Sequence, residues 1–365
     1  MRKEIQIVQF VEAFGGGVYT YVKDLCNFLA LNESTPNIKV HLIYSPNRVE
    51  FDKEIFKKEI HPNVILHELK IDRNINLSKD IKITKQIRRL LKNIQPDILH
   101  LHSSKAGVIG RFASFGLLKK NKIFYSPHGY AFLQKKISNK MIFFYKFVEY
   151  AMPFLFGGLT IASGFTEYKI SKKISKSLLI KNGVDFILPQ KLQNHQQNKQ
   201  LTIGTIGRLT LQKNPKLFNT IAEKLPEVNF IWIGNGELEN EIVSSNITVT
   251  GWVKTREELL NKLNEVDIYL QVSLWEGLPI ALIEAMAMRK PLLVSNIVGN
   301  KDCVKDGYNG FTFNSVDEAV DKINFLKDIN HRKKMGDNSF NKGFNEYNKA
   351  KNFSELIKVY LSYNK

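Results

Sequence analysis

Residues 201–208 read LTIGTIGR, a short apolar stretch that runs directly into a glycine and a basic residue. A similar arrangement occurs near the start of the chain, where residues 5–17 read IQIVQFVEAFGGG. Each stretch has the pattern of a strand, followed by a turn and then by a helical segment. The repetition predicts two similar domains.

Further apolar stretches follow each opening and are separated by helical segments. The clearest helix is expected over residues 78–93, with a strongly basic outer face. Because strands that alternate with helices form parallel sheets, the sequence predicts an α/β protein with one parallel sheet in each half. The expected strands are residues 40–44, 98–101, 123–126 and 159–162 in the first half, and 229–233, 247–250, 268–271 and 292–295 in the second.

The composition is that of a folded protein, and its charge is unevenly distributed. The 365 residues are 43% hydrophobic and carry a formal net charge of +18. Residues 1–200 hold 32 basic and 15 acidic residues, whereas the remainder holds 21 and 20. The first half is therefore expected to meet an anionic partner, with nucleic acid, anionic lipid and a phosphorylated substrate as the candidates. Cys26 and Cys303 lie in no metal-ligand or disulfide spacing and predict reduced, buried thiols in a cytosolic protein.

No targeting or membrane-spanning segment is expected. Glu4 and Glu12 interrupt the apolar pattern at the start, and the uncharged residues 151–166 contain Pro153 and three glycines. The polar residues after Pro189 have the composition of a linker. The predicted domains are residues 1–189, a linker at 190–200, residues 201–345, and a C-terminal helix at 346–365 that packs back on the first domain.

Ligands of open parallel sheets bind beyond the carboxyl ends of the strands, so the loops at these ends are the candidate sites. Gly15, Gly16 and Gly17 precede a helix whose N-terminal N–H groups can bind an anion, although an ordinary flexible turn explains them equally well. His128 lies in SPHGY, residues 126–130, directly after a strand. Its imidazole can donate or accept a hydrogen bond, and a purely structural role is the alternative.

Two loops of the second half carry charges. Arg208 and Lys213 lie in IGRLTLQKNP, residues 206–215, and together suit a diphosphate, unless they only cover a solvated surface. Glu276 and Glu284 lie in SLWEGLPIALIEAM, residues 273–286. Glu284 is surrounded by apolar helix residues and needs a partner, either a sugar or ribose diol or a salt bridge. Residues 298–302 could offer backbone N–H groups to an anion, or form an ordinary turn.

The two glutamates separated by seven residues closely resemble the E-x7-E motif of the large retaining glycosyltransferase family with the GT-B fold, and in particular its bacterial polysaccharide-biosynthesis members of group 1. The resemblance runs from about residue 5 to about residue 310. It implies two Rossmann-like doubly wound domains that face across a cleft. The supporting segments are the glycine turn, 127–129, 182–185, 207–208 with Lys213, 234–236 and 251–252.

The resemblance also implies a role for each matching residue. Arg208 and Lys213 would hold the diphosphate of the donor, Glu284 the ribose hydroxyls, and Glu276 the hydroxyls of the transferred sugar, which His128 would also contact. These roles make His128, Arg208, Lys213 and Glu276 the expected catalytic residues. The other expected substrate-binding residues are Gly15, Gly16 and Gly17 beside the diphosphate and acceptor, Gly299 and Asn300 through backbone amides, Val253 near the base, and Asn182 and Gly207.

The sequence contains no Asp-x-Asp triplet, and fixed cations can stabilise a leaving diphosphate as a divalent metal does. We therefore expect metal-independent transfer. The resemblance implies a hexosyltransferase that uses a nucleotide-sugar, a UDP-sugar, as co-substrate and has no cofactor. The resemblance favours attack on the same face of the sugar, with retention. The leaving diphosphate would help to deprotonate the acceptor hydroxyl.

Residues 135–156 combine lysines with many aromatic residues, a pattern that suits an anionic membrane surface. With the resemblance, this favours a polyprenyl-diphosphate-linked saccharide acceptor of capsule, exopolysaccharide or O-antigen synthesis. It also favours a peripheral location on the cytoplasmic face of the plasma membrane. Alternatives are a cytosolic transferase with a soluble acceptor and a sugar-nucleotide epimerase of the same architecture. A nucleic-acid partner is not expected, because no stacking motif is visible and the glutamates would be unexplained.

Overall fold

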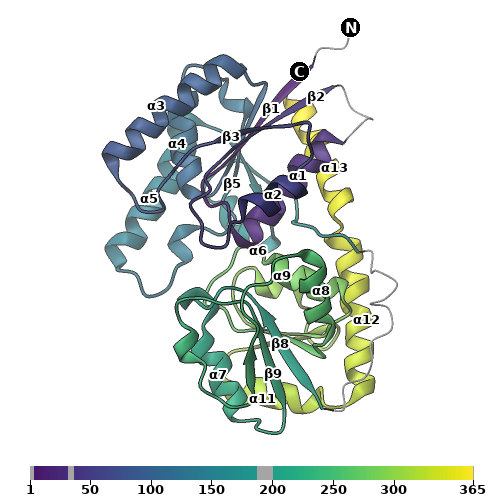
Figure 1. The fold of residues 1–365 in the computed structure, drawn as a ribbon. Coiled ribbons are helices and arrows are strands. Elements are labelled where there is room, and N and C mark those ends of the chain that lie inside the picture. The colour runs from purple at the N-terminus through teal and green to yellow at the C-terminus, as the bar shows by residue number, and fades with distance from the viewer. Residues whose placement is uncertain (1–3, 32–36, 187–199, 365) are drawn as a thin grey trace. The chain divides into compact units, whose positions relative to one another are not determined.

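The computed structural model describes residues 4–31, 37–186 and 200–364, which form two compact units (Figure 1). The first unit contains the chain up to Lys181 together with Ala350 onward, and the second contains Asn182–Lys349. Most of the predicted linker, residues 190–199, lies outside the described residues.

The first unit is built on a parallel sheet in the strand order β3-β2-β1-β4-β5-β6-β7. The order reverses between β1 and β4, where Val11 is paired with His102. This is the doubly wound arrangement that the sequence predicts. The strands are β1 (Ile5–Val11), β2 (Ile38–Tyr44), β3 (Val64–Glu68), β4 (Ile98–His102), β5 (Ile123–Ser126), β6 (Leu159–Ala162) and β7 (Ser177–Leu179).

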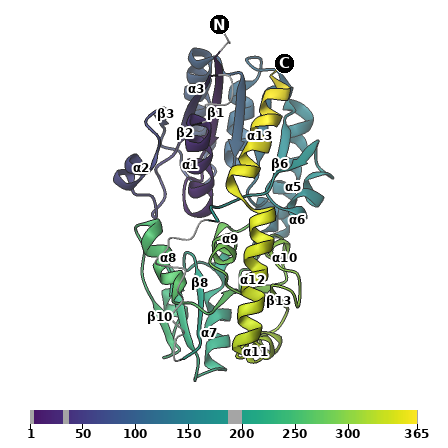
Figure 2. The same cartoon turned by 90° about the vertical axis from the view of Figure 1, so that its right-hand side faces the viewer.

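Helices cover both faces of this sheet because side chains alternate along each strand. On β1, Ile7 and Val11 face one core, and Val8 and Phe10 face the other. One core includes α1 and α13, which lie along the same face of the sheet, and the other includes α3 and α4 (Figures 1 and 2). The helices are α1 (Gly16–Ala30), α2 (Lys53–Glu59), α3 (Leu77–Ile94), α4 (Ser104–Ser114), α5 (Asn139–Phe156), α6 (Phe165–Ser171) and α13 (Lys349–Tyr363).

The second unit repeats this plan with the order β10-β9-β8-β11-β12-β13, all parallel, and reverses between β8 and β11. Its strands are β8 (Thr202–Ile206), β9 (Asn229–Ile233), β10 (Ile247–Val249), β11 (Ile268–Gln271), β12 (Leu292–Ser295) and β13 (Gly310–Phe313). Its helices are α7 (Pro215–Glu223), α8 (Arg256–Asn264), α9 (Ile280–Ala287), α10 (Asn300–Cys303), α11 (Val316–Phe325) and α12 (Ile329–Glu346).

The second unit begins before the predicted linker. The Asn182 side chain donates a hydrogen bond of 3.1 Å to the Leu278 carbonyl oxygen, and Val184 pairs with Asn348. These contacts attach the described residues 182–186 to the second unit. Across the three described ranges, no helix is both long and apolar enough to cross a membrane.

Candidate active site

A partly buried ion pair marks the point where the strand order of the second sheet reverses. Lys213 lies in the loop after β8, just before α7, and Glu276 lies in the loop after β11. Lys213 Nζ and Glu276 Oε1 are 2.7 Å apart although the residues are separated by 63 positions. The reversal of strand order thus brings together two of the predicted catalytic residues.

Glu276 is a carboxylate held by several donors. Besides Lys213, the side-chain amides of Gln212 and Gln271 donate hydrogen bonds to it, at 3.2 and 3.4 Å. Its side chain is only 8% exposed and that of Lys213 is 20% exposed. A carboxylate so deeply buried is stable only when cations and N–H groups compensate its charge, and these three donors do so.

Two predicted glycines lie close to other parts of the candidate site. A Cβ on Gly207 would lie 3.0 Å from Lys213 Cε, so the aliphatic part of the lysine packs across this residue. Gly299 has a φ of 83°, and a Cβ there would overlap the carbonyl oxygen of Gly277. The loops carrying Gly207 and Gly299 therefore approach the Lys213 and Glu276 pair closely.

Asn300 and Asn182 are buried, and their side chains serve the fold. Asn300 Nδ2 donates to Ser295 Oγ at 3.0 Å, and Asn300 Oδ1 accepts from Gln271 at 3.3 Å. Asn182 bonds to Leu278, two residues beyond Glu276. Both amides therefore position the loops of the candidate site, and a direct contact with substrate remains a prediction for Asn182 and for the backbone of Asn300.

Arg208 follows Gly207 directly and contributes a second cation. Its Nε and Nη2 atoms both lie 3.5 Å from the carboxylate of Glu237. The Arg208 side chain is 24% exposed and that of Glu237 is 58% exposed. A long contact with a well-solvated carboxylate is weak, so an anionic ligand can compete for the guanidinium.

Glu284 forms a salt bridge, which is one of the two kinds of partner that the sequence analysis considered for it. It lies inside α9, buried, and Arg256 Nη1 at the start of α8 is 3.1 Å from its Oε1. Burial, together with nearby Glu284 and Glu276, raises the pKa of the Tyr269 phenol. Both carboxylates therefore lie close enough to Tyr269 to affect its ionisation. Val253, three residues before Arg256, packs against the apolar core beneath.

In the first unit, the glycine turn begins α1. Gly15 is its N-cap, and Gly16 has a φ of 53°, in the left-handed region that favours glycine. A Cβ on Gly15 would lie 2.5 Å from a carboxylate oxygen of Glu50. The hydrogen bond from the Tyr19 N–H to the Gly15 carbonyl oxygen is the first of the helical pattern in α1. The N–H groups of residues 16–18 precede it, so they have no acceptor within the helix and lie at its positive end.

His128 lies at the carboxyl edge of the first sheet in a constrained backbone. Its φ is 52°, and the next residue, Gly129, donates its N–H to buried Glu167 at 2.8 Å. His128 Nε2 lies 2.9 Å from His102 Nδ1, and the ring packs edge-on against Tyr21. Burial lowers the pKa of His128 to about 4, so the imidazole is neutral near pH 7.

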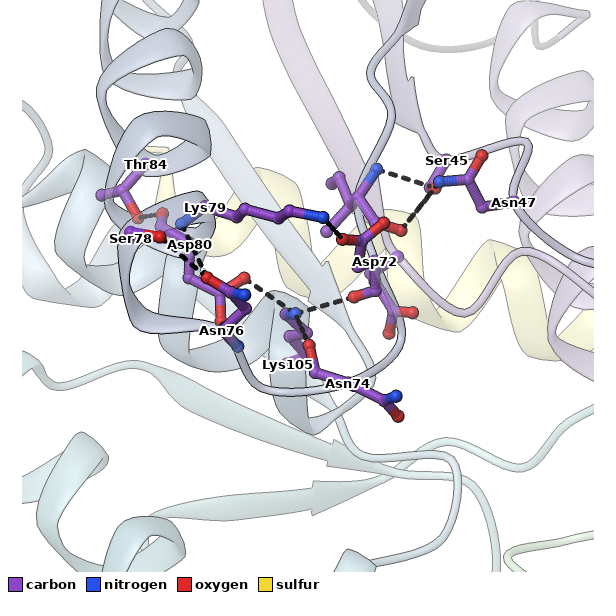
Figure 3. Close-up of polar contacts among 12 residues, drawn as sticks. Ser45, Asn47, Asp72, Asn74, Asn76, Ser78, Lys79, Asp80, Thr84 and Lys105 are labelled. Carbon is purple, nitrogen blue, oxygen red and sulfur yellow. Dashed lines mark hydrogen bonds and ion pairs between the residues drawn. The ribbon is translucent and has the colours of Figure 1, made fainter.

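Lys105 shows how a cation at the same edge can serve the fold alone. Its ammonium group donates to the carbonyl oxygens of Asp72 and Asn74, at 2.7 and 2.8 Å, and pairs with Asp80 at 2.8 Å (Figure 3). An ammonium group has three protons, and these contacts use all of them. Lys105 thereby ties the loop after β3 to α4.

Several residues at these sites were missed by the sequence analysis. His100 and His102 alternate along the buried strand β4, and polar residues at alternate buried positions are a signal that could have found them. Gln271 ends a buried strand and gives a similar signal. Arg256 gives no such signal in the sequence, because only the fold brings it close to Glu284. In the part of the chain described here, no three His, Cys, Asp or Glu side chains form a group that could hold a metal ion.

Two doubly wound parallel units with this site define the GT-B class of fold, and solved structures agree. Sucrose-phosphate synthase from Thermosynechococcus elongatus has a TM-score of 0.81 at 15% identity, over 98% of both chains. Anabaena HepE in complex with UDP and glucose has a TM-score of 0.79 at 16% identity, over 98% of this chain and 99% of that one.

Sequence comparisons give the family. Residues 189–342 match the family described as glycosyl transferases group 1, and residues 11–155 match glycosyl transferase 4-like. A relative from Escherichia coli, UDP-Gal:alpha-D-GlcNAc-diphosphoundecaprenol alpha-1,3-galactosyltransferase, is 30% identical over 79% of this chain and 81% of its own length. The capsular polysaccharide biosynthesis glycosyltransferase CapM of Staphylococcus aureus is 24% identical over 90% of both. The chain belongs to the group 1 glycosyltransferases and is a glycosyltransferase.

The buried histidines should make the first unit sensitive to acid. Burial lowers the pKa of His128 to about 4, and lowers those of His100 and His102 well below their ordinary value. In the unfolded chain each takes up a proton near pH 6.5. Between these pKa values the unfolded chain binds more protons, so the free energy of unfolding rises with pH.

We therefore expect stability to fall between about pH 7 and about pH 5, with His128 alone accounting for about 2 kcal/mol. Urea unfolding of the wild type and of His128→Gln at both pH values checks this expectation. The variant should lose less stability on acidification, since the carboxyl groups are the same in both proteins. An equal loss in the two proteins would contradict it.

Proposed function

We propose that this glycosyltransferase moves a hexosyl group from a nucleotide-sugar, a UDP-sugar, to a lipid-linked saccharide in bacterial polysaccharide synthesis. The proposed reaction retains the anomeric configuration and needs no metal. The observation that carries the proposal is the pairing of Lys213 with Glu276 at 2.7 Å, beside Arg208, where the second sheet reverses its strand order.

Charge development during the reaction supports a role for the two cations. Cleavage of the bond between sugar and diphosphate leaves negative charge on the diphosphate and positive charge on the sugar. Lys213 is 20% exposed, so solvent screens its charge only in part, and Glu276 holds the ammonium group in position. A cation fixed before the reaction stabilises the departing diphosphate more than the intact donor.

Glu276 suits a sugar ligand better than a nucleophile. Its oxygens already accept hydrogen bonds from Lys213, Gln212 and Gln271, which lowers their nucleophilicity. Sugar hydroxyls can donate further hydrogen bonds to the same carboxylate. This supports same-face attack by the acceptor without a covalent sugar intermediate, in which the departing diphosphate takes the acceptor proton.

Glu284 is the proposed ligand of the ribose. A carboxylate offers about four acceptor directions, so Glu284 can take two ribose hydroxyls while it keeps Arg256. Arg256 in turn compensates part of the charge of the buried carboxylate, at 3.1 Å. In the first unit, the N–H groups of the glycine turn at 15–17 are proposed to face phosphate or acceptor, and His128 to contact the sugar.

The acceptor class is proposed from relatives. The E. coli relative is named for galactose transfer from UDP-Gal to a GlcNAc-diphosphoundecaprenol, and the S. aureus relative for capsular polysaccharide synthesis. A lipid-linked saccharide therefore fits this chain best. A soluble acceptor is the alternative, and the surface of α5 supports the lipid-linked one.

An exposed aromatic stripe on α5 supports action at a membrane surface. Phe143, Phe147, Tyr150 and Phe154 recur at helical spacing and are 73%, 62%, 49% and 85% exposed. On the inner side of the helix, buried Glu149 accepts hydrogen bonds from Ser104 and Tyr125. The exposed lysines Lys135, Lys136 and Lys140 precede the stripe. Aromatic residues beside lysines suit the interface of an anionic bilayer, and we propose peripheral binding there.

Transfer assays on purified protein test the donor site. With radiolabelled UDP-sugars and a lipid-linked GlcNAc acceptor, Lys213→Ala should lower kcat by about 100-fold or more, because a fixed charge at the diphosphate is lost. Glu284→Gln should lower kcat/KM for the donor by about 10-fold to 100-fold. Lys216→Ala removes an exposed lysine of α7 and should leave turnover unchanged. Normal turnover in either site variant, with an intact circular dichroism spectrum, would contradict the assignment.

Chelation tests metal independence. If Lys213 and Arg208 supply the positive charge at the diphosphate, EDTA should leave the initial rate unchanged within about twofold. The control is a repeat with added magnesium or manganese, which should not raise the rate. Loss of transfer on chelation, restored by a divalent cation, would contradict this part of the proposal.

Vesicle sedimentation tests the membrane surface. The protein should bind phosphatidylglycerol-containing vesicles, and high salt should weaken the binding. Phe147→Ser with Phe154→Ser should reduce binding by about 10-fold or more, because each phenylalanine would lose burial worth about 1.5–3 kcal/mol. Val243→Ser, which removes a residue of the second unit that is 73% exposed, is the control. Absence of binding by the wild type, or an undiminished variant, would favour a soluble acceptor.

A further inference from the structure

A chain of buried hydrogen bonds runs through the first unit and ends at His128. The Ser126 hydroxyl lies 3.1 Å from the Ile161 carbonyl oxygen and 2.9 Å from His100 Nε2. His100 Nδ1 meets the Tyr360 hydroxyl, which also contacts Gln9 Nε2 at 3.4 Å.

The chain then continues toward the site. Gln9 Oε1 lies 2.7 Å from His102 Nε2, and His102 Nδ1 lies 2.9 Å from His128 Nε2. Its members come from β1, β4, β5, the loop after β5, and α13. All of them belong to the first unit.

The Ile161 carbonyl fixes the direction of the first bonds. A carbonyl oxygen only accepts hydrogen bonds, so the Ser126 hydroxyl must donate its single proton to the Ile161 carbonyl oxygen. Ser126 Oγ must then accept a hydrogen bond from His100 Nε2–H. Neutral His100 then has an unprotonated Nδ1, which accepts from the Tyr360 hydroxyl.

The same reasoning continues to the site. Tyr360 has no second proton, so Gln9 must donate with its amide and present its carbonyl oxygen to His102. His102 therefore donates from Nε2, and its bare Nδ1 must accept from His128 Nε2–H. The proton of His128 is thus assigned to Nε2, and Nδ1 carries a lone pair. Among the described residues, no group bonds to His128 Nδ1.

We propose that this chain sets the tautomer of His128, so that His128 meets substrate only as a hydrogen-bond acceptor at Nδ1. Ser126, His100, Tyr360, Gln9 and His102 are then positioning residues, and His128 is the residue that touches substrate. A neutral acceptor at this point selects a ligand that offers a donor, such as a sugar hydroxyl. The inference rests on the proposed function for the identity of the substrate, but not for the tautomer.

Removal of Ser126 Oγ should reverse the whole chain. Without its acceptor, His100 Nε2–H would be a buried donor with no partner, which is costly. If the proton moves to His100 Nδ1, Tyr360 donates to Gln9 and the amide of Gln9 flips. Gln9 then donates to His102 Nε2, and His102 Nδ1–H donates to His128 Nε2. His128 is left with its proton on Nδ1 and becomes a donor toward substrate.

NMR spectra that correlate each histidine ring nitrogen with the ring protons two bonds away measure the tautomer directly. They need protein labelled at histidine and no substrate. The wild type should show His128 protonated at Nε2, and Ser126→Ala should show it protonated at Nδ1. Ser126→Thr keeps the hydroxyl and should retain the wild-type tautomer. Ser45→Ala removes an equally buried hydroxyl of the same unit, bonded to Ile71, and should change nothing at His128. If Ser126→Ala fails to fold, Tyr360→Phe, which interrupts the chain, should give a mixture of both tautomers.

Transfer rates then link the tautomer to catalysis. Ser126→Ala should lower kcat/KM by about 10-fold to 100-fold, and Ser126→Thr should restore it to within about threefold of the wild type. An Nδ1–H tautomer in the wild type would overturn the inference. So would an Nε2–H tautomer that survives in folded Ser126→Ala or, where Ser126→Ala does not fold, in Tyr360→Phe. Wild-type protein that transfers no sugar while showing the expected tautomers would overturn the proposed function instead.

Discussion

Parallel pairing of β1 with β4 in the first unit, and of β8 with β11 in the second, is the constraint on which the candidate site residues of each unit depend. The strand order runs in opposite directions on the two sides of each pair. The loops that follow the two paired strands therefore diverge at the carboxyl edge of the sheet. In the second unit these loops carry Lys213 and Glu276. In the first unit they place the glycine turn after Val11 next to the strand that ends at His102, because these two residues are paired.

Buried carboxylates among the described residues fall into two groups. Glu12, Glu276 and Glu284 are paired with cations that are partly exposed, namely Arg48, Lys213 and Arg256. Glu149 and Glu167 instead accept hydrogen bonds from hydroxyl and backbone N–H groups inside the first unit. Neutral donors hold a carboxylate in place but bring no charge to a ligand. A partly exposed cation that pairs with a buried carboxylate can still be reached by an incoming anion. This is the arrangement expected of a binding site.

The sequence predicts most of the architecture because apolar strands and glycine turns are local signals. The strands that it misses are β3, whose residues are mostly half-buried, the three-residue strand β7, and β13. None of these contains the continuous buried run that marks a central strand. The sequence also predicts Glu276 and Lys213, because each follows a strand that is easy to recognise. It does not predict that Arg256 meets Glu284, or that Tyr360 meets His100, because such contacts depend on how distant elements pack.

The first unit is not one continuous segment of chain. Its sheet comes from the residues before Lys181, but Phe353, Leu356 and Tyr360 of α13 complete one of its cores. A ribosome therefore makes the whole of the second unit before it adds these side chains. Domains generally fold as units while they are synthesised. Here the earlier half must wait, with part of one face of its sheet uncovered, for residues that are translated after the later half.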